Sequence, residues 1–284
     1  MTPPVALTVA GSDSGGGAGV QADLKAFAAH RVFGTTVLTA LTAQSTRGVS
    51  GVLPVPADFV VAQVRAVVDD LPVAAVKTGM LGSAEVVAAV ADLAARGDLP
   101  RLVVDPVMVA TSGDRLLDED AERTYVDRLL PHALVLTPNL REAQVLLGRA
   151  ITTLEEQRVA ARDLGALGPR VVVVKGGHAV AGTEDVAVDV VWDGTGLVEL
   201  RAPRVATTND HGTGCTFSAA VAALLARDAE PVEAARAAKG YVQRALLGGA
   251  SWRLGAGHGP VDHLGWVATG DGAADLADLE AGRS

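Results

Sequence analysis

Short runs of β-branched and aliphatic residues alternate along the chain with longer segments in which apolar residues recur every three or four positions. The short runs are predicted strands and lie at 5–10, 36–43, 73–77, 102–105, 134–136, 171–175, 186–192 and 198–201. The longer, alanine-rich segments are predicted helices and lie at 19–30, 58–71, 84–96, 119–130, 140–147, 155–164, 213–226 and 231–247. Strands and helices that alternate at this spacing indicate βαβ units, so we expect an α/β fold with helices on both faces of a mostly parallel sheet.

Two segments depart from this alternation. The runs at 186–192 and 198–201 are joined by Asp-Gly-Thr-Gly, which predicts a β-hairpin inserted between two βα units. Residues 267–284 are rich in Gly, Ala and Asp without periodicity, and we expect a flexible tail there. Because no repeat or polar linker divides the rest, residues 1–266 are predicted to form a single domain.

The composition restricts the class of protein. Of 284 residues 49% are hydrophobic and 20% are charged, which is typical of a globular chain. The net charge of −9 and the aromatic content of 3% argue against binding to nucleic acid or to an anionic membrane. Any phosphate must therefore be bound locally, by backbone N–H groups, a metal ion or single cations.

The chain contains one cysteine, which excludes an intramolecular disulfide and a cysteine-based zinc site. The pattern of a signal peptide is absent from the first residues, and no apolar run reaches the roughly 18 residues that a membrane span needs. We therefore expect a cytoplasmic protein that does not bind membranes.

A glycine-rich segment, residues 11–19, separates the first predicted strand from the first predicted helix. It lacks the Lys-Ser/Thr ending of a Walker A loop, and its glycines do not have the spacing of a dinucleotide-binding fingerprint. A tight strand-to-helix turn needs one or two glycines, whereas this segment has five. We therefore favour a ligand-facing loop whose N–H groups lie at a helix N-terminus.

A second glycine-rich turn, His211-Gly-Thr-Gly-Cys215, leads directly into the helix predicted at 213–226. The first N–H groups of that helix have no internal partners and would form an anion hole. Cys215 lies in the first helical turn, so we expect the pKa of its thiol to fall below the ordinary value of about 8.5. Taken alone, a lone cysteine is more often a small buried hydrophobe. The position of Cys215 directly after a glycine-rich turn nevertheless favours a catalytic role.

Three further groups of polar residues follow predicted strands: Asp105, residues 137–142 and residues 175–178. They would converge where the carboxyl ends of the strands form a ligand crevice. Asn139 and Glu142 are three residues apart on one helix face and could hold Mg²⁺ through water. The alternatives are an N-cap for Asn139, a first-turn charge for Glu142 and a turn residue for Asp105. Lys175 closes four consecutive valines and should face an anion or a solvent edge.

These segments together resemble the hydroxymethylpyrimidine/phosphomethylpyrimidine kinases of the ribokinase-like superfamily. The matching stretches occur in the family's order at 6–25, 39–49, 77–81, 105–108, 136–139, 174–178, 211–216 and 257–261. The resemblance implies a three-layer α/β/α sandwich and a homodimer. It also implies ATP-dependent phosphorylation of 4-amino-5-hydroxymethyl-2-methylpyrimidine to its monophosphate and then its diphosphate, in thiamine biosynthesis with Mg²⁺.

The resemblance also implies roles for individual residues. The pyrimidine would lie against Gly11, Val107, Met80, Asp23 and Gln44, of which Asp23 and Gln44 would bind its polar edge. ATP would contact Lys175, Asn139 and Thr213, and Mg²⁺ would be held by Asp105, Asn139 and Glu142, partly through water. The catalytic residues would be Lys175 and the anion hole, which is formed by Gly212, Thr213, Gly214 and Cys215. Cys215 would also take the proton from the substrate hydroxyl.

Two other functions stay open from the sequence. A pyridoxine or pyridoxal kinase of the same superfamily would use the same loops, although the segment at 44–49 and Met80 favour the thiamine precursor. A non-catalytic nucleotide-binding regulatory protein should lack the Gly-Thr-Gly-Cys turn, Lys175 or the Asn139/Glu142 pair, and all of these are present.

Overall fold

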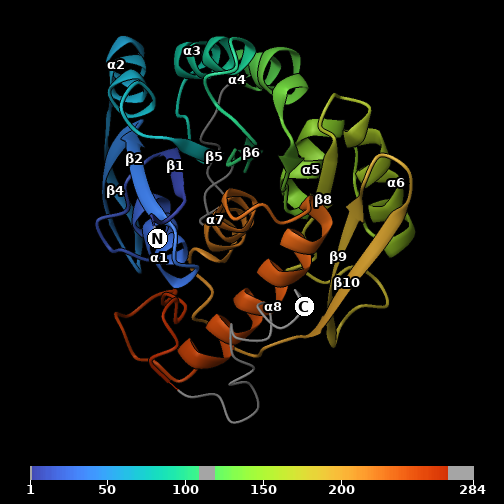
Figure 1. The fold of residues 1–284 in the computed structure, drawn as a ribbon. Helices are drawn as coiled ribbons and strands as arrows, with labels where there is room; N and C mark the ends of the chain where they lie inside the picture. Colours follow the sequence, from blue (N-terminus) through green and yellow to red (C-terminus); the bar gives the residue numbers. More distant parts are fainter. Residues whose placement is uncertain (1, 109–118, 268–284) are drawn as a thin grey trace, which may run out of the picture.

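One long sheet passes through the middle of the molecule (Figure 1). In residues 2–108 and 119–267, which the computed structural model describes, eight strands pair in the order β10-β9-β8-β7-β6-β5-β1-β2 and two more, β3 and β4, form a separate sheet. The strands are β1 (Val5–Ala10), β2 (Phe33–Leu38), β3 (Ala40–Ser45), β4 (Gly48–Pro54), β5 (Val73–Thr78), β6 (Val103–Val104), β7 (Val135–Leu136), β8 (Val171–Val174), β9 (Val186–Trp192) and β10 (Leu197–Pro203). The tail predicted for 267–284 lies outside the described residues, apart from Val267.

Helices cover both faces of the sheet. They are α1 (Gly19–Ala29), α2 (Ala57–Val68), α3 (Ala84–Ala95), α4 (Glu119–Thr124), α5 (Leu140–Leu147), α6 (Leu154–Gly165), α7 (Thr213–Ala226) and α8 (Pro231–Gly249). One hydrophobic cluster joins one sheet face to α2, α3, α5 and α6, and a second joins the opposite face to α1, α7 and α8. The expected three-layer α/β/α arrangement is therefore confirmed.

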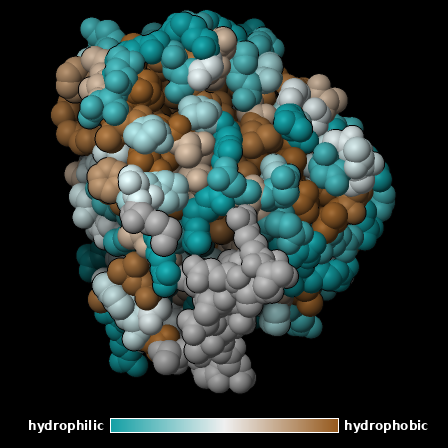
Figure 2. All heavy atoms as spheres, in the orientation of Figure 1, coloured by the Kyte–Doolittle hydropathy of each residue, from teal (hydrophilic) through white to brown (hydrophobic). Residues whose placement is uncertain are grey.

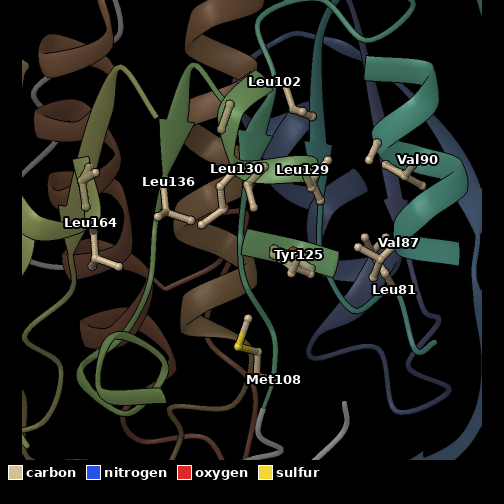
Figure 3. Packing of buried hydrophobic residues seen from close by; sticks show 14 of the residues in the cluster. Leu81, Val87, Val90, Leu102, Met108, Tyr125, Leu129, Leu130, Leu136 and Leu164 are labelled. Carbon is tan, nitrogen blue, oxygen red and sulfur yellow. The ribbon is translucent and has the colours of Figure 1, made fainter. Parts of the chain in front are cut away.

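The sequence pattern explains the two clusters. Successive side chains of a strand point to opposite faces, so neighbours such as Val103 and Val104 enter different clusters. Both faces are buried, which is why β8 consists of four valines instead of alternating apolar and polar residues. Figure 3 shows the first cluster, where Val87 and Val90 of α3 lie near Tyr125 and Leu129.

The strand order reverses at β1. This strand pairs in parallel with β2 on one side and with β5 on the other. The next strand in the chain, β2, therefore lies on one side of β1, whereas the later strands from β5 onward lie on the other side. In open α/β sheets, ligands bind beyond the carboxyl ends of the strands at such a switch point. The loops after β1, β5 and β6 begin at this edge.

One predicted strand, 36–43, is wrong. The chain ends β2 at Leu38 and begins β3 at Ala40, which pairs with β4 and not with the main sheet. Thr39 makes the turn, because its N–H donates to the carbonyl of Ala10 and its Oγ1 donates to the carbonyl of Met80. The strand β4 was not predicted, since its residues are exposed and lack the apolar run of a buried strand.

Two other predictions need adjustment. The hairpin of β9 and β10 is confirmed, but β9 also pairs antiparallel with β8, so the hairpin extends the main sheet. The helix predicted at 119–130 is α-helical only to Thr124 and continues as a π-helix over Tyr125–Leu129 and a 3₁₀-helix over Leu130–His132. Pro131, which has no N–H to donate, lies in this last turn.

Candidate active site

The loops at the switch point bring Gly11, Thr39 and Met80 together. A Cβ atom on Gly11 would lie 2.5 Å from Cε of Met80, so the missing side chain makes room for the methionine. Two of the predicted pyrimidine-binding residues therefore lie in contact at the ends of β1 and β5. A third, Val107, follows β6 and is partly buried, and its N–H donates to the carbonyl of Asp105.

Asp13 organises the glycine-rich loop. One carboxylate oxygen accepts the N–H of Gly15 at 2.8 Å, and the other accepts the N–H groups of Gly17 and Ala18. The second oxygen also lies 2.9 Å from Nε2 of His211. Although burial alone would raise the pKa of Asp13, the bond to His211 and those from the backbone lower it to about 2. The loop is thus closed around an ionised carboxylate.

The glycines of this loop also allow it to pack on the turn before α7. A Cβ atom on Gly17 would lie 2.5 Å from the ring of His211, and one on Gly212 would overlap the carbonyl oxygen of Gly17. Gly212 is the N-cap of α7 and has φ +82°, a left-handed conformation that favours glycine. Gly17 and Gly212 are therefore explained by contact between the two loops, which the prediction of a ligand-facing loop did not include.

The N-terminus of α7 contains the single cysteine. Cys215 is half-buried, and the backbone N–H of Gly19, the first residue of α1, slightly favours its thiolate form. The expectation of a lowered thiol pKa is wrong for this structure: burial raises the pKa of Cys215 to about 11, because Lys77 offsets only part of the desolvation and Asp105 and Asp23 add to it. The thiol is therefore protonated at neutral pH in the ligand-free protein.

Asp105 and Lys175 form a buried ion pair at the ends of β6 and β8. Nζ of Lys175 lies 2.9 Å from Oδ1 of Asp105, and Ser218 of α7 donates to Oδ2 at 3.0 Å. Burial opposes ionisation of Asp105, but Lys175 and Lys77 outweigh it and lower the pKa of the carboxyl. A Cβ atom on Gly214 would lie 3.2 Å from Nζ of Lys175, which places the ammonium against the first turn of α7.

Asn139 and Glu142 form the cap of α5. Oδ1 of Asn139 accepts the N–H of Glu142 at 2.9 Å, and Oε2 of Glu142 accepts the N–H of Asn139 at 2.7 Å. This reciprocal capping box is the structural alternative considered for both residues. Burial raises the pKa of Glu142 to about 8, and the nearby Asp105 adds to this while Lys175 opposes it.

Asp23 has a different environment from the one expected. Both carboxylate oxygens lie within 3.0 Å of Nζ of Lys77, and Thr8 donates to Oδ2 at 2.6 Å. The side chains of Asp23 and Lys77 are fully buried. The free structure therefore gives Asp23 a lysine partner and no exposed edge for a pyrimidine, so direct contact with substrate would require Asp23 to exchange a partner.

Gln44 is partly buried on β3 at the other side of the glycine-rich loop. Its Oε1 accepts a hydrogen bond from Thr42, and its Nε2 lies 3.4 Å from Nε2 of His211. A cavity of about 420 Å³ lies between Gln44, Ser14 and Arg47. The structure thus brings Gln44 to the same two loops that hold Asp13 and Cys215.

Four residues of this region were missed from the sequence: Asp13, Lys77, His211 and Ser218. A signal existed for one of them, because Lys77 closes the run 73–77 as Lys175 closes 171–175. Asp13 and His211 lie within segments that were singled out for their glycines. Ser218 lacked a signal, since a serine in an alanine-rich helix does not reveal which element it contacts.

Two properties of the described residues bear on ligands. Within 2–108 and 119–267, no three His, Cys, Asp or Glu side chains are grouped as a metal site would require. Over the same residues, none of the helices combines the length and the apolar composition needed to cross a lipid bilayer. A divalent ion at this site would therefore need further ligands from water or from substrate.

Known proteins resemble the chain over most of its length. A family model described as "Phosphomethylpyrimidine kinase" matches residues 13–262. The hydroxymethylpyrimidine/phosphomethylpyrimidine kinase of Rhizobium meliloti is 52% identical over 92% of this chain and 97% of that protein. The protein of the same name from Streptomyces coelicolor is 52% identical over 94% of this chain and 96% of that protein.

A solved structure shares the fold closely. The ADP complex of Bacillus subtilis pyridoxal kinase superposes with a TM-score of 0.84 and 37% identity, covering 92% of this chain and 98% of that one. The curated relatives are more similar in sequence than this pyridoxal kinase. On the family match and the extent of these alignments, the chain belongs to the phosphomethylpyrimidine kinase family.

Proposed function

We propose that this protein transfers the γ-phosphoryl group of ATP to 4-amino-5-hydroxymethyl-2-methylpyrimidine and then to the resulting monophosphate. Membership of the family supports the activity. One geometric observation carries the assignment of the site: the ammonium of Lys175 lies against the first turn of α7, where Gly214 leaves room for it. A cation and unpartnered helical N–H groups at one place form a site for a phosphoryl group.

The transferred group would bind between Lys175 and the N–H groups of Gly214 and Cys215. The N–H of Thr213 donates to the carbonyl of Asp210 at 3.3 Å and would join them only by releasing it. Charge builds up on the phosphoryl oxygens as the bond to the leaving group lengthens, and Lys175 with the N–H groups of Gly214 and Cys215 is already in position to stabilise it. Lys175 is held by Asp105 before ATP arrives, so it does not need to be ordered at the moment of reaction. Positioning and charge neutralisation therefore supply most of the rate enhancement.

Mg²⁺ fits the polar residues at the ends of β6 and β7 when ATP supplies the remaining ligands. The capping bonds use one oxygen of Asn139 and one of Glu142, so the second carboxylate oxygen of Glu142 is left for water or metal. Asp105, which bonds Lys175 and Ser218, would act through water. The ion would neutralise phosphate charge, and Mg²⁺ characteristically keeps several waters and few protein carboxylates.

Cys215 would accept the proton of the substrate hydroxymethyl group. With a thiol pKa of about 11, only a small fraction is thiolate at neutral pH, and the proton of an alcohol leaves late in phosphoryl transfer. In the second reaction the acceptor is a phosphate oxygen that is already ionised. The proposed base is therefore needed mainly in the first reaction.

The pyrimidine would lie between Gly11, Met80 and Val107, with its polar edge toward Gln44 and Asp23. Met80 offers an apolar, adaptable surface for a ring. Gln44 can donate and accept a hydrogen bond at once, which suits an amino-pyrimidine edge. Asp23 would contribute from its ion pair with Lys77, through its charge or after rearrangement.

Pyridoxal kinase activity is the second candidate, favoured by the superposition on the Bacillus subtilis pyridoxal kinase. An ADP-release assay with the hydroxymethylpyrimidine, its phosphate and pyridoxine as separate acceptors tests both. We expect the two pyrimidines to give the higher kcat/KM values. A preference for pyridoxine would reverse the assignment, and absence of ADP release with all three acceptors would favour a non-catalytic nucleotide-binding protein.

We also propose that two copies pair through the face formed by β4 and α2. Leu53 and Phe59 are 64% and 60% exposed, and Val49 and Val52 are exposed beside them. Figure 2 shows hydrophobic residues at the edge of the molecule where β4 and α2 lie in Figure 1. Light scattering should give the mass of a dimer, and Leu53→Glu with Val52→Glu should give a monomer. A monomeric wild type would reject the pairing.

A cytoplasmic location stays a prediction from the single cysteine.

A further inference from the structure

The antiparallel pairing of β8 with β9 stops one residue before Lys175. Its last pair is Val174 with Val190, and in this register Lys175 would next face Asp189. A Cβ atom on the following residue, Gly176, would overlap a carbonyl oxygen of β9. The chain therefore leaves the sheet so close to β9 that a side chain at this position is excluded.

At this point a side chain of β9 replaces the backbone as the hydrogen-bond acceptor. The N–H of Gly176 donates to Oδ1 of Asp189 at 2.8 Å. The other carboxylate oxygen, Oδ2, lies 2.9 Å from Nζ of Lys239 of α8. The side chains of Asp189 and Lys239 are 4% and 14% exposed, so this carboxylate is almost completely removed from water.

Packing is a weak reason for this ion pair. The residues on either side of Asp189 are buried valines, and buried ion pairs are often no more stabilising than apolar residues of the same volume, because both charges lose their hydration. An apolar side chain, however, cannot accept a hydrogen bond. Gly176 is buried, so without Asp189 its N–H would lose its partner inside the protein.

The bond from Gly176 to Asp189 also restrains Lys175. A peptide unit is planar, so the N–H of Gly176 and the Cα atom of Lys175 belong to one rigid plane. On the other side of β8, the N–H of Lys175 donates to the carbonyl of Pro138 at 2.8 Å. The ammonium group of Lys175 lies 2.9 Å from Asp105. Lys175 is thus held at its backbone from both sides and at the end of its side chain.

The residues after Lys175 make such a restraint necessary. Gly176 and Gly177 have no side chains to limit their backbone angles, and a Cβ atom on Gly177 would meet nothing within 4 Å. The carbonyl of Gly177 accepts a hydrogen bond from Arg204, which is partly exposed. The carboxylate of Asp189 is therefore the buried anchor of this glycine pair.

We propose that Asp189 is a positioning residue for phosphoryl transfer, whose carboxylate fixes the Gly176 peptide so that Lys175 meets the phosphoryl group at the first turn of α7. The inference rests on the proposed function for the role of Lys175. Asp189 acts through Lys175 and not on substrate. Because a small displacement of a positioned group costs a large factor in rate, loss of this anchor should appear in kcat.

The test compares two double variants that both lack the ion pair. Asp189→Leu/Lys239→Met removes the two charges and the acceptor, whereas Asp189→Asn/Lys239→Met removes the charges and keeps an amide oxygen for the N–H of Gly176. With the hydroxymethylpyrimidine as acceptor, we expect kcat to fall at least about tenfold in the first and to stay within about threefold of the wild type in the second. The KM for the pyrimidine should not change, because Gly11 and Met80 lie at the ends of other strands.

Hydrogen exchange of the Gly176 amide, measured in the ligand-free protein, gives a readout that needs no substrate. This N–H should exchange at least about tenfold faster in the Leu/Met variant, and the Asn/Met variant should keep the protection of the wild type. Equal exchange rates, or equal kcat values, in the two folded double variants overturn the proposal. Absence of kinase activity in the wild type would reject the proposed function, and the exchange rates would still decide whether Asp189 anchors Gly176.

Glu199→Gln is the matched control. Glu199 lies on β10, the strand beside β9, and its carboxylate pairs with Arg158 of α6 and with Arg201 of its own strand. This variant also loses ion pairs of the β9–β10 hairpin. We expect it to keep the wild-type kcat and the wild-type exchange rate of Gly176, and a fall in kcat equal to that of the Leu/Met variant would contradict a specific role for Asp189.

Asp189→Ala covers the case in which the Leu/Met variant does not fold. The smaller side chain leaves room beside Lys239, whose partly exposed ammonium can turn toward water. This variant lacks the acceptor and should show the same faster exchange of Gly176 and the same loss in kcat. Wild-type values for either quantity would overturn the proposal.

Discussion

Nε2 of His211 lies 2.9 Å from Oδ2 of Asp13, and this contact joins the glycine-rich loop after β1 to the turn that begins α7. The two residues are 198 positions apart in the chain. The first loop carries the pyrimidine-binding residues expected near Gly11, and the second carries the anion hole at Cys215. This polar contact therefore links the two halves of the proposed site, together with that between Gln44 and His211.

Replacing Asp13 by Asn should weaken this link. The amide keeps one acceptor oxygen, so it cannot accept all the bonds that Gly15, Gly17, Ala18 and His211 direct at the carboxylate. The pKa of Asp13 falls from 3.8 to about 2 on folding, which corresponds to about 2 kcal/mol of stability. We expect Asp13→Asn to lose about this amount at neutral pH, measured by urea unfolding.

The pH dependence gives a second check on Asp13. Because the folded pKa is lowered, the contribution is present above pH 3.8 and is lost as the pH falls toward 2. The difference between wild type and variant should therefore shrink in acid. Asp193→Asn is the control, because Asp193 also accepts backbone N–H groups, at the turn of the β9–β10 hairpin, far from the site. A constant difference over this range would contradict the assignment.

Gly212→Ala should disturb catalysis more than its backbone strain alone explains. The left-handed φ of +82° costs an alanine about 1–2 kcal/mol, and the new methyl would also overlap the carbonyl oxygen of Gly17. The turn of Gly212 and the loop of Gly17 must then separate, which displaces the anion hole from the pyrimidine. We expect kcat to fall at least about tenfold, the effect of about 1.4 kcal/mol in the barrier.

Gly97→Ala separates strain from displacement. Gly97 has φ +81°, nearly the same conformation, but a Cβ atom there meets nothing within 4 Å. It should lose a similar strain energy in thermal unfolding and keep the wild-type kcat. Equal kcat values for the two variants would show that contact between Gly17 and Gly212 is irrelevant to the reaction.

The order of strands and helices was predictable because buried strands and amphipathic helices have different periods. Helices α5 and α7 have the predicted bounds, since Gly148 and Arg227 follow them as C-caps and Asn139 and Gly212 precede them. The exposed strand β4 was not predictable in this way. Its pairing with β3 depends on where the chain leaves the main sheet at Thr39, which is a tertiary property.

The site was predictable as a location more than as a set of contacts. Strand ends and helix N-termini identify where Asp105, Lys175 and Cys215 converge, because parallel strands share an edge. Their electrostatics were not predictable, since burial and the neighbours of each group decide the pKa. Cys215 illustrates this: the helix N-terminus favours a thiolate, but desolvation prevails. Asp23 likewise acquired Lys77 as a partner only in three dimensions.

Glu142 should make the protein less stable as the pH rises from 4.5 to 8. Burial raises the folded-state pKa to about 8, so in this window the folded protein holds a proton that the unfolded chain releases. The stability lost on passing through the window is as much as about 4 kcal/mol. Glu142→Gln keeps an acceptor for the N–H of Asn139 but cannot ionise. Its urea unfolding should therefore change less with pH than that of the wild type.

Glu156→Gln is the matched control for this prediction. Glu156 completes the other capping box, with Thr153 at the start of α6, but it is exposed and its hydrogen bonds from Thr152 and Thr153 lower its pKa. It therefore releases its proton below the window in which Glu142 acts. The variant should follow the wild-type pH dependence, and a slope that survives in Glu142→Gln would assign the effect to another group.

Cys215→Ala should affect the two phosphorylations unequally. A base that removes the proton of an alcohol contributes about a hundred- to ten-thousand-fold, whereas a phosphate acceptor is already ionised at neutral pH. We expect kcat for the hydroxymethylpyrimidine to fall within this range and kcat for its phosphate to fall less than about tenfold.

The same variant tests the raised pKa of the thiol. Since the pKa of Cys215 is about 11, the wild-type rate with the alcohol should rise nearly tenfold per pH unit from about pH 7 to 9, as the thiolate fraction does. The rate with the phosphate acceptor should lack this rise, and so should the residual rate of Cys215→Ala with either acceptor. Gly97→Ala, which changes no group near the thiol, should keep the wild-type profile. Equal losses for both acceptors, with a flat wild-type profile, would instead mean that Cys215 shapes the anion hole and takes no proton.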